Sequence, residues 1–395
     1  MKIVINGAGI AGTTLAYWLR RAGHDVLLVE AAPRLRTGGY VIDFGLVGYD
    51  IAEKMGLIPR LREVGYRVAE LRYVDRTGRT RASAPVDALA RLTQGRYITV
   101  QRSDLAAAIH GVLDDGIEML FGDSVAAIDD VGGGLRVGFD HAPACEADLV
   151  IGADGLHSRV RELMFGRDAG CEVSLGYHVA AFEVNGYRPR DELVYLGYGV
   201  PGRQIYRFAM RDDTTLFLLV FADDYLRGQR PTTDAERKAV VAGVYADVGW
   251  ECPQILAALQ SVDTLYFDRA SQIRLDRWTR GRVALVGDAA ACVSLVAGEG
   301  SSLAMAEAYM LAGELHRCGG DHATAFARYE QPLRPFLRRK QLAVARTASS
   351  LAPKTAFGLH FRNLAVRLMA RLPIMVDFFI GRQQRDQIQL PDYRF

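Results

Sequence analysis

The stretch IVINGAGIAGTTLAYWLRRAGHDVLLVE, residues 3–30, joins an apolar strand, a glycine loop, an amphipathic helix and a second apolar strand in one βαβ unit. Gly7, Gly9 and Gly12 stand at G-x-G-x-x-G spacing. The first glycine permits a tight turn, the second lets the backbone approach a pyrophosphate, and the third lets helix and strand pack closely. The helix start after Gly9, at Ile10 and Ala11, offers free amide groups to phosphate. We therefore predict a dinucleotide site.

Glu30 ends the second apolar strand of this unit. A carboxylate at that position can accept hydrogen bonds from the hydroxyl groups of an adenosine ribose, so we expect an unphosphorylated ribose. Both FAD and NAD meet these requirements, and the rest of the chain has to decide between them.

Bulk properties exclude several classes of protein. The chain has 395 residues, half of them hydrophobic, and a formal net charge of +2. Nucleic acid is not expected as a partner, because phosphate backbones are bound by concentrated basic surfaces. The five cysteines are widely spaced without a C-x-x-C pair, which favours a reducing, cytoplasmic setting and no metal site. Monomer and dimer both remain open.

Residues 357–380 form an apolar-rich stretch. It is interrupted by charged residues that are costly in hydrocarbon, namely Arg362, Arg367, Arg371 and Asp377. We therefore predict no transmembrane segment. Between residues 334 and 382 basic residues far outnumber that single acid. The bias fits a helix on a membrane surface or, more commonly, the solvated face of a packing helix.

The middle of the chain changes character. Aromatic and β-branched runs separated by turn residues fill residues 179–222 and predict an antiparallel sheet. We predict a hairpin over residues 71–82, turning at Thr77 and Gly78, and a strand from Tyr97 that leads into a helix capped by Ser103. A sheet domain is thus inserted between the nucleotide-binding segments.

Two further strand-to-helix turns carry acids and glycines. In DLVIGADGLHSRVR, residues 148–161, Asp154 and Gly155 follow an apolar strand, and Ser158 opens a helix. In VALVGDAAACVSLVAGEGSS, residues 283–302, Asp288 follows a buried strand, where it could accept bonds from a polyol hydroxyl. Either turn could instead simply complete the sheet.

Gly298, Glu299 and Gly300 precede a helix predicted to begin near Ser301. A helix start aimed at a reduced, anionic flavin would stabilise it by about 1 kcal/mol. Oxidised nicotinamide is cationic and gains nothing from that field, so this loop favours FAD.

Together, Gly7/Gly9/Gly12/Glu30, Asp154-Gly155 and Gly287-Asp288 resemble the FAD-dependent aromatic hydroxylases, the class A flavoprotein monooxygenases of the p-hydroxybenzoate hydroxylase fold. The resemblance spans residues 1 to about 335. Residues 38–57, GGYVIDFGLVGYDIAEKMGL, and 287–315 look most like the branch of tetracycline-inactivating and polyketide-tailoring monooxygenases.

This resemblance implies an α/β fold: a Rossmann-like FAD-binding domain with an inserted antiparallel β-sheet substrate domain and C-terminal helices. We assign residues 1–70, 97–170 and 266–335 to the FAD-binding domain and residues 71–96 and 171–265 to the substrate domain. By resemblance, the C-terminal helical segment 336–395 would bridge the two domains.

The resemblance also implies residue roles. Glu30 would bind the adenosine ribose, Arg102 the pyrophosphate and ribityl region, and Asp288 the ribityl chain or pyrophosphate. Asp154 would serve the flavin, and Gly155 would leave room for a transient nicotinamide.

The loop of Leu295, Gly298, Glu299 and Gly300 would lie near the flavin. The chain departs from the family here, because Ala291 and Leu295 replace a common His and Pro. The proline normally stiffens the loop facing the reactive edge of the flavin, so its loss puts that rigidity in question.

The implied reaction is that of an NAD(P)H-consuming monooxygenase. NAD(P)H visits and reduces bound FAD, reduced flavin adds O2 to form a C4a-hydroperoxide, and an aromatic or polycyclic small molecule receives the distal oxygen. Hydroxylation and Baeyer-Villiger-type insertion stay open, as does NADH against NADPH. The alternative is a flavin-binding protein that sequesters or cyclises a small molecule without net oxygenation.

The substrate is expected between the flavin and the inserted sheet. By strand alternation only some of the sheet's aromatic residues can face the flavin, and the rest would be core or surface. These aromatic residues are Tyr195, Tyr198, Tyr206, Phe208, Phe217 and Phe221.

Overall fold

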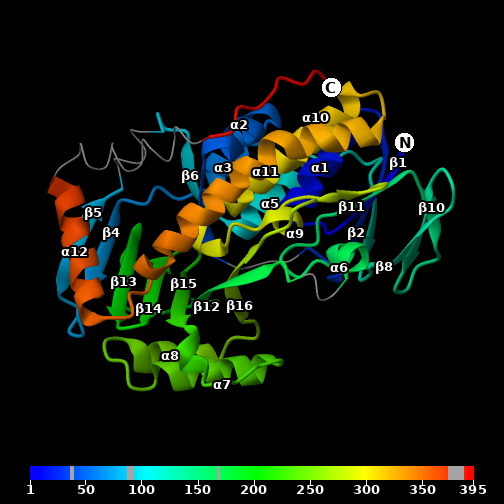
Figure 1. Cartoon of the computed structure of the whole chain (residues 1–395). Coiled ribbons are helices and arrows are strands. Elements are labelled where there is room, and N and C mark those ends of the chain that lie inside the picture. The colour runs from blue at the N-terminus through cyan, green and yellow to red at the C-terminus, as the bar shows by residue number, and fades with distance from the viewer. Residues whose placement is uncertain (36–39, 87–92, 167–169, 372–386) are drawn as a thin grey trace.

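The structure is a computed structural model that describes residues 1–35, 40–86, 93–166, 170–371 and 387–395. A six-stranded sheet and a seven-stranded sheet organise these residues (Figure 1). The sequence predicts that the site lies between these two sheets.

The six-stranded sheet has the order β17-β18-β11-β1-β2-β7, and all its neighbours are parallel except β17 and β18. Its strands are Thr279–Arg280 (β17), Val283–Leu285 (β18), Leu149–Gly152 (β11), Lys2–Asn6 (β1), Asp25–Glu30 (β2) and Glu118–Phe121 (β7). The inner residues of β1 and β2 and all of β11 are apolar or glycine, as a sheet covered on both faces requires.

The seven-stranded sheet has the order β16-β12-β15-β14-β13-β4-β5. Its strands are Tyr266–Ile273 (β16), Glu172–Asn185 (β12), Thr214–Ala222 (β15), Arg203–Ala209 (β14), Val194–Val200 (β13), Glu70–Val74 (β4) and Thr80–Pro85 (β5). The predicted antiparallel sheet and the β4–β5 hairpin are confirmed, although β13 and β4 run parallel. β16 pairs with β12 in this sheet, although the predicted limits place it in the FAD-binding domain.

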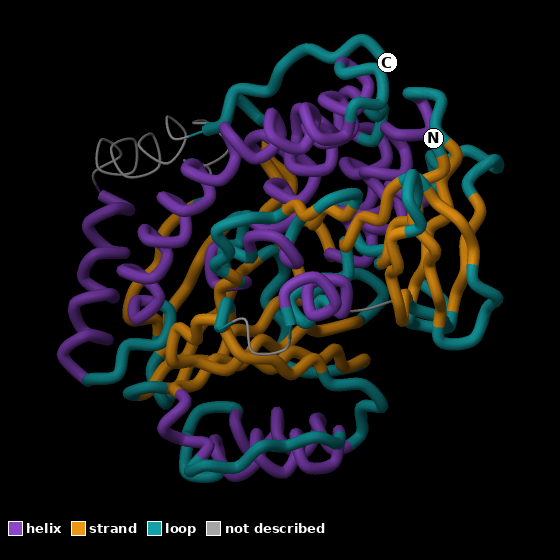
Figure 2. Tube along the Cα trace, turned by 45° about the vertical axis from the view of Figure 1, so that its right-hand side comes forward, coloured by secondary structure: helices purple, strands orange, loops and turns teal. Residues whose placement is uncertain are grey.

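Helices cover both sheets. Around the six-stranded sheet lie Ile10–Arg21 (α1), Leu46–Lys54 (α2), Ile58–Val64 (α3), Arg102–His110 (α5), Arg159–Phe165 (α6), Asp288–Ala291 (α9), Gly300–Arg317 (α10) and His322–Thr347 (α11). Asp234–Tyr245 (α7) and Cys252–Gln260 (α8) lie beneath the seven-stranded sheet, with the helices of the six-stranded sheet above it (Figure 2).

Smaller elements complete the chain. Two minor sheets pair Val41–Gly45 (β3) with Tyr97–Gln101 (β6), and Val125–Asp130 (β8) with Leu135–Phe139 (β9) and Cys145–Ala147 (β10). Short 3-10 helices are formed by Asp223–Leu226 (η1), Leu295–Ala297 (η2) and Ala348–Ser350 (η3).

Two helix starts test the predicted caps. Ser158 caps α6, because its Oγ accepts from the backbone N of Arg161 at 3.0 Å, as predicted. The Ser103 cap is wrong, because α5 already begins at Arg102 with Gln101 in the capping position. The strand β6 runs into this helix without an intervening loop, so no residue is left for a serine cap.

The described C-terminal helices contact both halves of the molecule. α11 packs on α10, and Ala352 after it packs among Tyr177, Val179 and Val220 of the seven-stranded sheet. Helix α12, Ala356–Arg371, lies along β5 (Figure 1). Residues 372–386 of the predicted C-terminal segment lie outside the described residues. Among the described helices, none has the length and hydrophobicity to cross a bilayer.

Candidate functional site

Three loops meet at the carboxyl edge of the six-stranded sheet. In the parallel register Asn6 lies opposite Gly152, and Gly152 lies opposite Leu285, so β1, β11 and β18 end at the same level. A Cβ added to Gly7 would lie 2.5 Å from the carbonyl oxygen of Ala153. The loops that carry Gly7, Asp154 and Asp288 are therefore neighbours in space.

Glycine is needed at different positions of the first loop for different physical reasons. A Cβ on Gly12 would lie 1.9 Å from the Gly7 carbonyl oxygen, so this glycine permits close packing within the loop and helix. Gly9 has φ −75°, which any residue adopts, and a Cβ there would meet no atom of the described residues within 4 Å. The open space beside Gly9, at the start of α1, fits a pyrophosphate approaching the backbone.

Glu30 holds the glycine loop in place. Its Oε2 accepts from the backbone N of Ala8 at 2.9 Å, and its Oε1 accepts from that of Ala32 at 2.9 Å. Each carboxylate oxygen has a further lone pair, so a ribose hydroxyl could still donate to it. The ribose contact itself stays a prediction.

Asp154 is bound entirely by protein groups. It accepts from Asn6 Nδ2 at 3.0 Å, from Ser158 Oγ at 2.5 Å and from two backbone amides at the start of α6 at 2.8 and 3.1 Å. These bonds tie β1 to α6 and fix the loop between them. Gly155 next to it has φ +79°, and a Cβ there would meet no described atom within 4 Å.

Asp288 and Arg102 lie around one pair of tyrosines. Burial raises the pKa of Tyr40 and of Tyr266, and Asp288 raises both further, whereas Arg102 lowers them. The Arg102 guanidinium is exposed and forms no hydrogen bond or ion pair with the described residues. The cation and the half-buried carboxylate are therefore available to the phosphate and ribityl groups of a cofactor.

Sequence reasoning missed a carboxylate beneath this loop. Glu307 of α10 is 2 % exposed, and its Oε2 accepts from the backbone N of Gly287 at 2.8 Å. Tyr329 Oη lies 3.4 Å from the same oxygen and donates to the Leu285 carbonyl at 3.0 Å. Burial raises the pKa of Glu307 to about 8. An acid within the apolar run AMAEAYML, residues 304–311, was the available signal.

The last loop lies between the two sheets. Leu295 opens η2 and packs beside Tyr266, and Gly298 has φ +68°. Added Cβ atoms on Gly298 and Gly300 would meet no described atom within 4 Å. Helix α10 begins at Gly300, close to the predicted start, and the preceding Glu299 accepts from Lys340 Nζ at 2.9 Å. The loop thus presents an open backbone at a helix start.

Cys292, next to this loop, belongs to the core. The Cys292 thiol is buried, and both burial and the nearby Asp288 raise its pKa, so it is an inert core group. Among the described residues, no group of three or more His, Cys, Asp and Glu side chains could hold a metal ion.

The aromatic residues of the large sheet divide between its faces as alternation requires. Tyr198, Phe217 and Phe221 pack in the core with α7 and α8. Tyr195 and Phe208 lie on the opposite face, in contact with Tyr40 and Tyr66 of the cofactor half. Tyr206 shares that face and contacts Tyr73.

A carboxylate stands where this aromatic face meets β3. Asp43 is exposed, and its Oδ1 accepts from Thr99 Oγ1 at 2.8 Å and from Tyr195 Oη at 3.3 Å. Burial and Asp43 raise the pKa of both Tyr97 and Tyr195. These phenols therefore stay protonated near neutral pH; Tyr195 donates to Asp43, and Tyr97 Oη accepts from Thr99 Oγ1.

Comparisons with known proteins agree with this geometry. The profile of the family described as "FAD binding domain" matches residues 1–331. An uncharacterized Mycobacterium tuberculosis protein is 39 % identical over 355 residues, covering 89 % of this chain and 94 % of that protein. A flavin-dependent monooxygenase from an unknown prokaryotic organism is 31 % identical, covering 86 % and 87 %.

A comparison with a solved structure supports the same family for the fold. The crystal structure of tetracycline destructase Tet(51) superimposes with a TM-score of 0.83 at 29 % identity, covering 99 % of each chain. The predicted fold class and FAD as the cofactor are thereby confirmed, with NAD(P)H as the reductant typical of the class. The chain belongs to the FAD-binding class A flavoprotein monooxygenases and is an FAD-dependent monooxygenase.

Proposed function

We propose that this monooxygenase oxygenates an apolar, electron-rich aromatic or polycyclic small molecule of the polyketide kind, bound between the FAD loops and the large sheet. The observation that carries the proposal is the face of that sheet turned toward the cofactor half and away from α7 and α8, where the half-buried Tyr195 packs on the buried Phe208. Flat apolar rings stack well on such a surface.

The cofactor half would hold FAD through its loops. The open backbone at Gly9 and the first amides of α1 would bind the pyrophosphate, Glu30 the ribose, and Arg102 and Asp288 the pyrophosphate and ribityl groups. When bound, FAD would accept electrons from NAD(P)H and, once reduced, would activate O2.

The reactive ring would lie near the start of α10. The helix dipole there would stabilise negative charge on a reduced ring by about 1 kcal/mol. The open backbone at Gly298 and Gly300 would let the ring approach. Leu295 and Tyr266 would exclude water from this region, which limits loss of the activated oxygen as peroxide.

Asp43 would orient the substrate. Its exposed carboxylate can accept a hydrogen bond from a phenolic or enolic hydroxyl, while Thr99 and Tyr195 hold it in place. The two phenols beside it are protonated and cannot serve as bases. Tet(51) is a tetracycline destructase, and tetracyclines are polycyclic compounds that carry hydroxyl groups, so the similarity supports the same substrate class for this chain. NAD(P)H and the five free cysteines suit a cytoplasmic enzyme.

A panel of phenolic polycyclic compounds tests the proposal. A substrate should accelerate NAD(P)H oxidation by the FAD-loaded enzyme and gain one oxygen atom by mass spectrometry. Asp43→Asn should raise KM for hydroxyl-bearing substrates by about tenfold, the effect of a lost charge-assisted hydrogen bond. If NAD(P)H oxidation yields only peroxide with the whole panel, the substrate class proposed here is wrong.

A further inference from the structure

Helix α12 carries an exposed apolar stripe. Phe357 is 78 % exposed, Phe361 63 %, Leu364 44 % and Leu368 41 %. At 100° per residue these four positions fall within an arc of about 60° on one side of the helix. Val366, on the opposite side, is buried against Tyr73 and Ala82 of the β4–β5 hairpin. The helix is therefore anchored by one side and presents its stripe outward.

The charged residues of the segment that carries this α12 stripe are all basic. Residues 331–376 contain nine Lys and Arg and no Asp or Glu. His360 and Arg367 are exposed next to the stripe. An apolar face flanked by basic residues is typical of a helix that lies in the interface of an anionic membrane.

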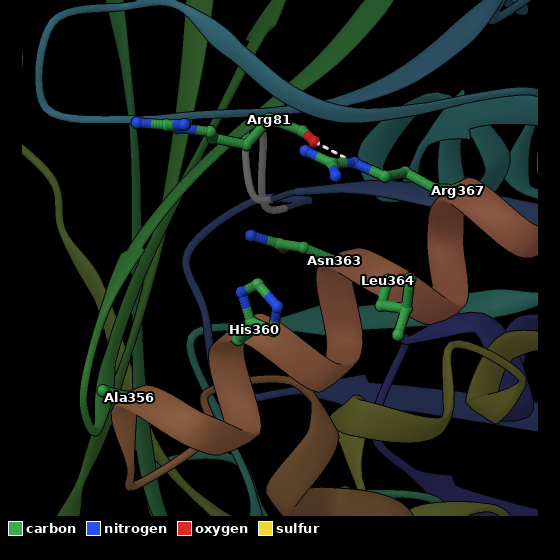
Figure 3. A pocket seen from close by; sticks show the side chains of 6 residues that line it. All are labelled: Arg81, Ala356, His360, Asn363, Leu364 and Arg367. Carbon is green, nitrogen blue, oxygen red and sulfur yellow. Dashed lines mark hydrogen bonds between the residues drawn. The ribbon is translucent and has the colours of Figure 1, made fainter.

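A cavity beside the stripe fits a negatively charged group. Its volume is about 360 Å³, and it is lined by Arg81, Ala356, His360, Asn363, Leu364 and Arg367 (Figure 3). None of these described lining residues is a carboxylate.

The polar side chains of α12 in this cavity can all donate. Asn363 Oδ1 lies 3.4 Å from Arg362 Nη2, which leaves the Asn363 amide nitrogen for a ligand. Arg367 donates through Nε to the Arg81 carbonyl and keeps its two terminal nitrogens for a ligand. The Arg81 guanidinium instead pairs with Asp75 at 2.9 Å and points away from α12 (Figure 3).

We propose that the α12 stripe docks on an anionic phospholipid surface, with its apolar side chains at the boundary of headgroups and acyl chains and a headgroup phosphate in the adjoining cavity. Leu364 belongs to both the stripe and the cavity lining, so one lipid could contact both. The inference does not depend on which substrate the enzyme oxygenates.

A second copy of the chain fits this face less well. Two such stripes packed together would bring His360 and Arg367 of both copies into one interface, and residues 331–376 offer no acid to pair with them. An anionic bilayer supplies both the missing charge and the apolar phase.

Vesicle sedimentation of the full-length, FAD-loaded protein tests the proposal. The protein should sediment with phosphatidylcholine vesicles that contain phosphatidylglycerol, not with pure phosphatidylcholine, and the binding should weaken as salt is raised. The double variant Phe357→Ser/Phe361→Ser should lower the partition coefficient by about tenfold or more. Leu163→Ser is the control, because Leu163 on α6 is 43 % exposed and lies outside the stripe.

A second variant examines the cavity. Asn363→Asp adds a negative charge among the donors and should weaken binding to anionic vesicles by about fivefold, because one unit charge near such a surface contributes about 1 kcal/mol. Circular dichroism and FAD content would show that both variants keep the fold.

Three results would overturn the proposal. They are absence of binding to anionic vesicles, equal binding by the double variant and the Leu163→Ser control, and equal binding to neutral and anionic vesicles. Light scattering, which measures the oligomeric state, provides one more test. A dimer that Phe357→Ser/Phe361→Ser dissociates would assign the stripe to a second copy, contrary to the proposal.

Discussion

Gly9 and Gly12 stand three residues apart, but a side chain would meet different surroundings at each. Gly9→Val adds atoms to the open space beside α1, so the chain should fold with a small loss of stability at the helix start and bind no FAD. Gly12→Val should prevent folding, because a Cβ there lies 1.9 Å from the Gly7 carbonyl.

Visible absorbance per chain and the thermal midpoint of the FAD-free protein separate these two effects. A Gly9→Val protein that still purifies with its full complement of FAD would show that the pyrophosphate lies elsewhere.

Asp288 supplies a charged acceptor at the end of β18. Asp288→Ala should weaken FAD binding by about 1.5–3 kcal/mol, the usual effect of removing a hydrogen bond to a charged group. Titration of the FAD-free protein with FAD, followed by flavin fluorescence, measures this change. Asp276→Ala is the control, because that side chain is 99 % exposed. Equal affinity in both variants would exclude Asp288 from the site.

The buried carboxyl group of Glu307 should make the free energy of unfolding of the chain depend on pH. Burial raises its pKa from 4.5 to about 8, so between these values the folded chain holds a proton that the unfolded chain has lost. The free energy of unfolding should therefore fall as the pH rises from about 4.5 to about 8, then level off. Glu307→Gln has no carboxyl proton to release, so the free energy of unfolding of this variant should fall less over the same pH range.

Urea unfolding at a series of pH values measures both declines. The exposed pair member Glu63, changed to Gln, serves as the control. If the wild type and Glu307→Gln lose stability in parallel, Glu307 is not the group that titrates.

At the scale of elements, η2 shows what the loss of the family's proline means. Leu295 is the first residue of this 3-10 helix, and Ser294 before it has φ +95°, outside the range that a residue preceding proline favours. Proline at 295 is therefore incompatible with the backbone conformation of Ser294. Leu295→Pro should lower the free energy of unfolding by about 1 kcal/mol or more, because the loop would have to rearrange. Denaturant unfolding measures the change, and a variant at least as stable as the wild type would show that this loop adopts a proline-compatible conformation at no cost.

Elements with local signals were predictable from the sequence. The β4–β5 hairpin and the Ser158 cap follow from turn and capping residues within a few positions. The parallel pairing of β4 with β13 was not predictable, because the two strands are about 120 residues apart and nothing local encodes their contact. Ser103 failed as a cap for a related reason, since β6 and α5 join without the loop that a cap requires.

At the scale of the whole molecule, the site depends on contacts between the two halves. Gln101 Nε2 donates to Glu183 Oε1 at 3.1 Å, and Tyr195 Oη reaches Asp43 at 3.3 Å. The glycine spacing and strand ends are local, so the sequence could predict that the loops at Gly7, Asp154 and Asp288 meet at one edge of the sheet. It predicted that only some aromatics face the flavin, but which of them do depends on the pairing register of distant strands. Glu307 was missed because its partner, the Gly287 amide, is defined only in three dimensions.

The FAD content of the purified wild-type chain shows whether the loops at Gly9, Asp154, Asp288 and Gly300 converge on one flavin. The visible spectrum before and after incubation with FAD and gel filtration gives the ratio of flavin to protein. We predict a ratio that reaches a full equivalent. A protein that stays colourless after this reconstitution would contradict the account.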